Sequence, residues 1–213
     1  MSNDALILEL SAGLAPVRRR SVTREVAMLI GLGLTELALI LGLGLMRPDM
    51  GQMIGSPYMF WKLGSLAVLA IISFVIAVRS FSPAFSPRKG LALVVVLAVA
   101  AIVTGLLIDP GPANQPTLLD RLSPVEGLLC AASIIVLSVP VMALLAVLMR
   151  RGAPTHPERS ALASGLAAGT CGALIFAFCC RVNDPLYIVF WYFTACGAVT
   201  IAARWIMPRR FQL

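Results

Sequence analysis

The sequence predicts an all-α integral membrane protein, a bundle of six transmembrane helices with both termini in the cytoplasm. The first observation is composition. Of the 213 residues, 59% are hydrophobic and 13% are charged, and the mean hydropathy is +0.92, whereas a soluble domain is about half apolar and about a quarter charged. The second is a series of apolar runs of about twenty residues, enough to cross a bilayer. The third is the clustering of basic residues behind the net charge of +7, which indicates membrane topology rather than direct nucleic-acid binding.

Six apolar runs are long enough to form the predicted spans. We expect these spans at residues 26–46, 59–78, 91–108, 128–148, 161–179 and 187–203. An even number of spans places both termini on the same side of the membrane. Within the fifth run, three residues separate Gly165 from Gly169, and such a face of small residues lets a neighbouring helix approach closely.

The start of the fourth span carries its own signal. Ser123 is a candidate N-cap, Pro124 suits the first helical position and Glu126 occupies the third, a pattern typical of helix N-termini. Further along the same run, Pro140 predicts a kink near the middle of the span, because proline removes one backbone hydrogen bond and crowds the preceding turn.

The distribution of basic residues predicts which side each loop faces. Thirteen of the seventeen lysines and arginines fall in the N-terminal segment, in the loops 79–90 and 149–160, and at the C-terminal end. They are Arg18, Arg19, Arg20, Arg24, Arg79, Arg88, Lys89, Arg150, Arg151, Arg159, Arg204, Arg209 and Arg210. The other four, on the opposite side, are Arg47, Lys62, Arg121 and Arg181. Cytoplasmic loops carry an excess of lysine and arginine, so both termini are expected in the cytoplasm.

The chain divides into three predicted parts: a cytoplasmic N-terminal segment at 1–22, a transmembrane domain at 23–208 and a cytoplasmic tail at 209–213. The N-terminal segment has one apolar stripe at helical spacing, formed by Leu6, Ile7, Leu10 and Leu14. Within residues 1–16, the opposite face carries acidic Asp4 and Glu9 and no basic residue, although a helix lying on an anionic membrane normally has basic residues there. We therefore expect this segment to bind a protein partner. The alternative is a structureless tail.

Groups capable of chemistry gather between the fifth and sixth spans. Cys179 and Cys180 are adjacent, and Asn183, Asp184 and Pro185 follow them, a sequence that favours a tight turn. An aromatic cluster comes next, formed by Tyr187, Trp191 and Tyr192. Such clusters lie near the lipid–water boundary. A metal site here would gain at most a weak, hard ligand from the Asn-Asp pair.

Cys130 lies near the start of the fourth span, at a depth similar to that of Cys180. Exposed thiols at this face can be oxidised, can bridge to each other or can bind a soft metal ion. Spacing alone leaves both the chemical and the packing interpretation open. Arg181 would favour the thiolate of its neighbour. Cys171 and Cys196 lie deeper in their spans, where a thiol is usually a small packing residue.

Other candidate groups are sparse. Glu36 lies near the middle of the first span, where a charged side chain is costly and faces the bundle interior. It is either the ion site of a small six-span transporter or a structural group paired with Lys62 or a nearby hydroxyl. His156 is the single histidine, which argues against a haem-containing redox enzyme. The sequence has no CxxC pair for thiol–disulfide exchange, no catalytic triad and no phosphate loop. We therefore expect neither an enzyme nor a bound cofactor.

Several short stretches occur in a specific order along the whole chain. They are Asp4-Ala5-Leu6-Ile7, Leu14-Ala15-Pro16-Val17-Arg18-Arg19, Arg47-Pro48-Asp49, Arg150-Arg151-Gly152-Ala153-Pro154-Thr155, and Cys180 with Asn183-Asp184-Pro185 and Trp191-Tyr192. Together they resemble the NrsF family, negative regulators of extracytoplasmic-function sigma factors in proteobacteria.

The resemblance implies a multi-pass anti-sigma factor in the lipid bilayer of the bacterial inner membrane. Its N-terminal segment would bind the extracytoplasmic-function sigma factor, through Asp4, Leu6, Ile7, Leu10, Leu14, Pro16, Val17 and Arg18. Outward-facing Cys130 and Cys180 would sense heavy metals or oxidants, as transient metal ligands or as redox thiols. Cys179 stands where many members carry another residue, so whether it shares the sensing role is open.

Overall fold

The computed structural model describes residues 21–108 and 121–209, and every regular element within these ranges is a helix. The helices are α2 (Val22–Gly42), α3 (Met50–Met53), α4 (Pro57–Ser80), α5 (Arg88–Ile108), α7 (Pro124–Arg151), α8 (Pro157–Ala177) and α9 (Pro185–Arg209). Six of them are long and apolar enough to cross a membrane, which confirms the predicted all-α bundle of six spans. The predicted sigma-factor-binding residues, from Asp4 to Arg18, lie outside the described residues.

Helix α2 begins and ends about one turn before the predicted 26–46. Its start is capped by the Ser21 side chain, which accepts a hydrogen bond from the Arg24 amide. Its end is set by Gly44, whose φ of +67° is left-handed. The Gly44 amide donates to the Leu41 carbonyl and the Leu45 amide donates to the Ile40 carbonyl, a glycine C-cap of the Schellman type. The predicted boundary was wrong because Gly44 was taken as one more residue of the apolar run.

Helix α7 begins at Pro124, as predicted, and continues through Pro140 to Arg151. The expected cap is only partly present. Ser123 is the N-cap residue, but its backbone is left-handed, with φ +37°, and its side chain does not cap the helix. A left-handed conformation is unusual for a residue with a side chain. The helix thus starts with Pro124 at its first turn and without a capping hydrogen bond from the Ser123 side chain.

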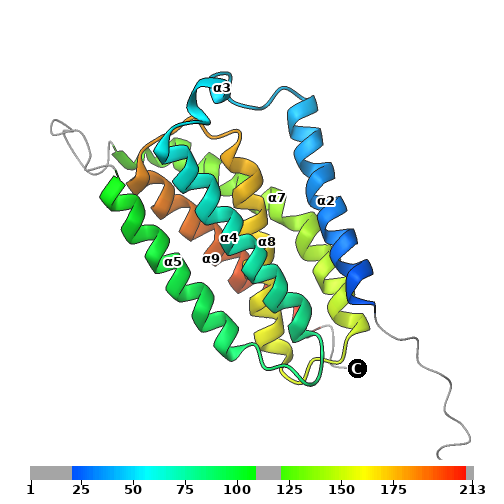
Figure 1. The fold of residues 1–213 in the computed structure, drawn as a ribbon. Coiled ribbons are helices and arrows are strands. Elements are labelled where there is room, and N and C mark those ends of the chain that lie inside the picture. The colour runs from blue at the N-terminus through cyan, green and yellow to red at the C-terminus, as the bar shows by residue number, and fades with distance from the viewer. Residues whose placement is uncertain (1–20, 109–120, 210–213) are drawn as a thin grey trace, which may run out of the picture.

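Helix α8 is the centre of the bundle, packed against α4, α7 and α9 (Figure 1). Its buried residues are almost all alanine, glycine, serine or threonine. A Cβ atom on Gly165 would lie 2.7 Å from the Thr200 Cα, and one on Gly169 would lie 3.1 Å from the Cys196 Cα. The predicted small-residue face is confirmed, because only glycine lets α9 come this close.

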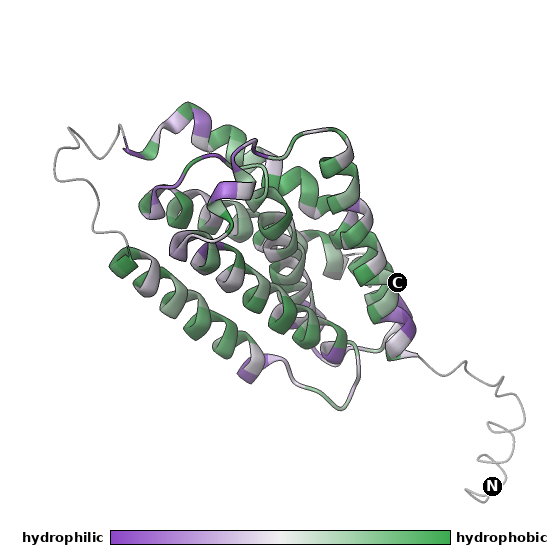
Figure 2. Ribbon diagram, turned by 45° about the horizontal axis from the view of Figure 1, so that its top comes forward, coloured by the Kyte–Doolittle hydropathy of each residue, from purple (hydrophilic) through white to green (hydrophobic). Residues whose placement is uncertain are grey.

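Helices α2 and α5 lie at opposite edges of the bundle (Figure 1). Large apolar side chains point outward from them and from the neighbouring helices, including Leu34, Val96 and Leu107. Figure 2 shows the same pattern, with apolar helix bodies and more hydrophilic residues toward the helix ends and loops. An outward apolar surface is what a lipid environment requires of helices whose backbone bonds are satisfied internally. We call the end that carries α3 and the loop 178–184 the α3 end.

Candidate functional site

The structure brings Cys130 and Cys180 together at the α3 end. Cys130 is in the second turn of α7, and Cys180 is in the loop that joins α8 to α9. The two thiols share a side-chain hydrogen bond, and the Cys180 thiol also donates to the Val182 carbonyl at 3.9 Å. The side chains were expected to be exposed, but they are buried, with 4% and 6% of their surfaces accessible. Apolar and aromatic side chains of α7, α8 and α9 pack around Cys130 in one buried cluster.

The loop that carries Cys180 is shaped by the start of α9. Asp184 caps that helix, because its carboxylate accepts a 2.8 Å hydrogen bond from the Leu186 amide. The same carboxylate forms a two-fold ion pair with Arg121, with N–O distances of 2.8 and 2.9 Å. On the next turns, the Trp191 indole donates to the Leu122 carbonyl at 2.8 Å. These contacts tie the loop 178–184 to the residues just before α7, the helix of Cys130.

A buried cation faces the thiol pair. Lys62 on α4 is only 1% accessible, and its Nζ makes no hydrogen bond of ordinary length within residues 21–108 and 121–209. It lies 5.8 Å from the centre of the Tyr192 ring, and the Cys180 sulfur is the group whose negative charge attracts it most strongly. The hydrogen bond from Cys130 lowers the pKa of Cys180, burial opposes this, and the charge of Lys62 lowers it further.

The cation beside the thiols is therefore Lys62, whereas the sequence pointed to Arg181. Arg181 is exposed and is not among the main groups that lower the pKa of Cys180. A lysine inside an apolar span was the available signal, because intramembrane charges usually mark functional sites. Its direction around the helix axis was not visible in the sequence.

Asn183 and Asp184 already have partners on the protein. The Asn183 side-chain oxygen accepts a 2.9 Å hydrogen bond from Arg47, and Asp184 is bound by Arg121. Among the described residues, no group of three or more histidine, cysteine, aspartate or glutamate side chains is placed to hold a metal ion. The local donor set is thus the two sulfurs, which suit a soft ion.

All five thiols are free, and the other three cysteines have surroundings of their own. Cys179 is partly buried against the other apolar cluster of the bundle, and burial raises its pKa. The adjacent cysteines thus face different surroundings. Cys171 lies beside Gly33 on α2, and Cys196 packs against Gly169 on α8. The packing role of these two cysteines stays a prediction.

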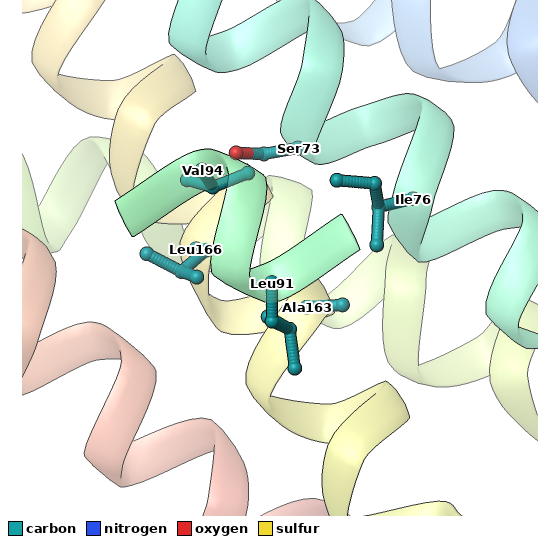
Figure 3. Close-up of a pocket in the computed structure, with 6 residues that line it drawn as sticks. All are labelled: Ser73, Ile76, Leu91, Val94, Ala163 and Leu166. Carbon is teal, nitrogen blue, oxygen red and sulfur yellow. The ribbon is translucent and has the colours of Figure 1, made fainter. Parts of the chain in front are cut away.

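Glu36 pairs with neither Lys62 nor a nearby hydroxyl of the described residues, the two forms of the structural role expected of it. It is 8% accessible, and neither carboxylate oxygen has a hydrogen-bond partner in the described part of the chain. Its charge acts on Cys171 of α8. A shallow depression elsewhere is lined by Ser73, Ile76, Leu91, Val94, Ala163 and Leu166 from α4, α5 and α8 (Figure 3). Its apolar lining offers one hydroxyl to orient a ligand, too few for a specific site.

Comparison with known proteins gives matches over nearly the whole chain. The family model described as negative regulator of sigma F (NrsF) matches residues 10–212. The anti-sigma-F factor NrsF of Caulobacter vibrioides is 29% identical, covering 97% of this chain and 99% of that protein. The probable anti-sigma-F factor NrsF of Azospira oryzae is 31% identical over 90% of each chain. No solved structure matches significantly.

Proposed function

The chain belongs to the NrsF family of negative regulators of sigma F, and we propose from this that it is an inner-membrane anti-sigma factor with a thiol sensor. In this proposal it sequesters an extracytoplasmic-function sigma factor at its cytoplasmic N-terminal segment. It releases that factor when Cys130 and Cys180 react with a heavy-metal ion or an oxidant. The observation that carries the sensor role is the buried contact between these two free thiols, fifty residues apart.

The two thiols support two kinds of input. An oxidant would join the sulfurs in a disulfide between α7 and the loop 178–184, and a soft metal ion would be held between two thiolates. Either product fixes a geometry that differs from that of the free thiols. Such a ligand shifts the protein toward a second conformation only if it prefers that conformation over the first.

The output in this proposal is the N-terminal segment, whose stripe includes Leu6, Leu10 and Leu14. Helices shorter than about 12–15 residues are marginal alone in water, so the segment would order in a groove of the sigma factor. Burying one leucine contributes roughly 1.5–3 kcal/mol. Since about 1.4 kcal/mol is a factor of ten, Leu10→Asp should weaken binding at least tenfold.

Co-purification of the sigma factor with wild-type and Leu10→Asp protein tests this output. We expect much lower recovery with the variant and expression of the sigma-dependent genes without any metal or oxidant. Glu36→Gln is the control, because Glu36 lies inside a span and should leave recovery unchanged. Equal recovery with wild type and Leu10→Asp would mean that the sigma factor docks elsewhere, for example on the arginine-rich loops.

The proposal also requires the α3 end to face the periplasm. The arginine distribution supports this orientation, with both chain ends in the cytoplasm. A reporter fused after Asp120 should register the periplasm, and one fused after Pro154 should register the cytoplasm. The reverse pattern would place the thiols on the cytoplasmic side and remove the basis for a periplasmic sensor. The competing transporter role of Glu36 predicts instead that Glu36→Gln abolishes a transport activity.

A further inference from the structure

One arginine joins the chain segment after α2 to the loop that carries Cys180. Arg47 lies between α2 and α3, yet only 2% of its surface is accessible. Its Nε and Nη2 donate to the two oxygens of Asp49 at 2.7 and 2.6 Å. This pair orients the guanidinium, and the third nitrogen is left to face the loop 178–184.

The contacts of Arg47 with that loop involve both side chain and backbone. Its Nη1 donates to the Asn183 side-chain oxygen at 2.9 Å and to the Cys180 carbonyl at 3.4 Å. Its own amide donates to the Phe178 carbonyl at 3.2 Å. The loop residues on both sides of the thiol, and the thiol's own carbonyl, are thus held by a single residue more than 130 positions away.

We propose that Arg47 is the positioning residue of the thiol pair, which holds the Cys180 backbone so that its sulfur meets Cys130, and which links that pair to helix α2. This inference rests on the proposed sensor function for the meaning of the thiols. The contacts of Arg47 give a route from Cys180 to the N-terminal segment, because α2 is the helix that follows directly on that segment. A product that moves Cys180 moves the acceptors of Arg47, and Arg47 is five residues beyond the end of α2.

Arginine suits this position for a specific reason. Its planar guanidinium presents donors in a fixed fork, so it can bind a carboxylate with two nitrogens while the third meets other acceptors. Lysine carries one compact ammonium and cannot keep all of these contacts. A lysine variant should retain the charge and the fold but hold Cys180 less closely.

The test measures the thiol–thiol geometry in full-length protein in lipid nanodiscs. Dibromobimane forms a fluorescent bridge between two neighbouring thiols, and mass spectrometry of the peptides carrying Cys130 and Cys180 quantifies that bridge. Monobromobimane labelling of Cys180 is measured alongside. We expect Arg47→Gln to slow bridging at least tenfold without slowing single labelling, Arg47→Lys to slow it several-fold, and Asn183→Ala to give an effect in the same range as Arg47→Lys.

Arg121→Gln is the matched control, because Arg121 also binds this loop through a carboxylate, Asp184, without donating to the Cys180 carbonyl. We expect its bridging rate to stay within about threefold of wild type. Equal bridging in wild type and all Arg47 variants would overturn the proposal, as would an equal loss in Arg121→Gln and Arg47→Gln. If Arg47→Gln misfolds, wild-type bridging in Arg47→Lys and Asn183→Ala would overturn it. Since no sigma factor is present, failure of the sensor proposal is measured separately, by induction in cells.

Discussion

Two places in the bundle set a buried charged side chain beside a cysteine, and they differ in almost everything else. At the α3 end, Lys62 faces Cys180 and its neighbour Cys130. Deeper in the bundle, Glu36 faces Cys171. Both charged groups are buried, and neither has a hydrogen bond of ordinary length among the described residues. Burial of a charge near a thiol therefore does not by itself distinguish a chemical site from a packing position.

The sign of the charge and the presence of a second thiol make the distinction. A thiolate is the form that binds metals and attacks oxidants, and a nearby cation stabilises it. A carboxylate would repel a thiolate instead. Cys180 also has a second sulfur as partner, so it can end in a disulfide or share a metal ion, whereas Cys171 has a glycine and a carboxyl as neighbours. We therefore assign chemistry to the α3 end and packing to the deeper position.

The largest expected difference is in signalling. Cys130→Ser or Cys180→Ser should abolish induction of the sigma-dependent genes by soft metals or oxidants, because each removes half of the thiol pair. Cys171→Ser and Cys196→Ser should leave induction largely intact. The measurement is a transcriptional reporter in cells with and without the inducer. A normal response in all four variants would contradict the thiol-sensor proposal.

The charges give the next contrast. Lys62→Met keeps the side-chain length but removes the cation, so the lowered pKa of Cys180 should rise. The lowered pKa leaves Cys180 largely ionised at pH 7, so a rise of about one unit makes the thiolate about tenfold scarcer only at pH values below that pKa. The midpoint of the curve of Cys180 alkylation rate against pH, measured by mass spectrometry over a pH series, should therefore move up by about one unit. Glu36→Gln should change the Cys180 rate less than twofold. Equal alkylation rates of Cys180 in wild type and Lys62→Met across the pH series would mean that Lys62 does not stabilise the Cys180 thiolate.

The sequence predicted depth along the helices better than direction around them. Span positions follow from counting apolar residues at a fixed rise, so Cys130 and Cys180 were placed at one level. Successive residues on a helix turn by about 100°, and the facing of Lys62 and Glu36 depends on how their helices pack. That is why Lys62 was weighed as one partner for Glu36, and Arg181 as the cation beside the thiolate.

The sequence prediction recognised one local backbone signal and missed two others. The Gly165–Gly169 face was recognised because two small residues with three residues between them have one common use in spans. Gly44 lay among other apolar residues, and its capping role became visible only in its φ of +67°. Helix α3, one turn long, was missed because four residues carry no periodic pattern.

The smallest expected effect concerns packing. One glycine near Cys130 and one near Cys171 allow the two places to be compared directly. A Cβ atom on Gly127, three residues before Cys130, would overlap the Trp191 ring, which is itself held by the hydrogen bond to Leu122. Overpacking typically costs about 1–3 kcal/mol, so Gly127→Ala should destabilise the protein by that amount. On α2, a Cβ on Gly33 would lie 3.9 Å from the Cys171 sulfur, an ordinary contact.

Gly33→Ala should therefore be tolerated, since alanine also favours the helix over glycine by about 0.8–1.0 kcal/mol. Thermal unfolding followed by tryptophan fluorescence in one detergent compares the two variants directly. Gly127→Ala should also shift the emission of Trp191 and slow Cys130–Cys180 bridging, because the indole ties the residues before α7 to α9. Equal stability of the two variants would mean that the α3 end repacks freely. In that case the packing around Cys130 and Cys180 would not hold the two thiols in a fixed geometry.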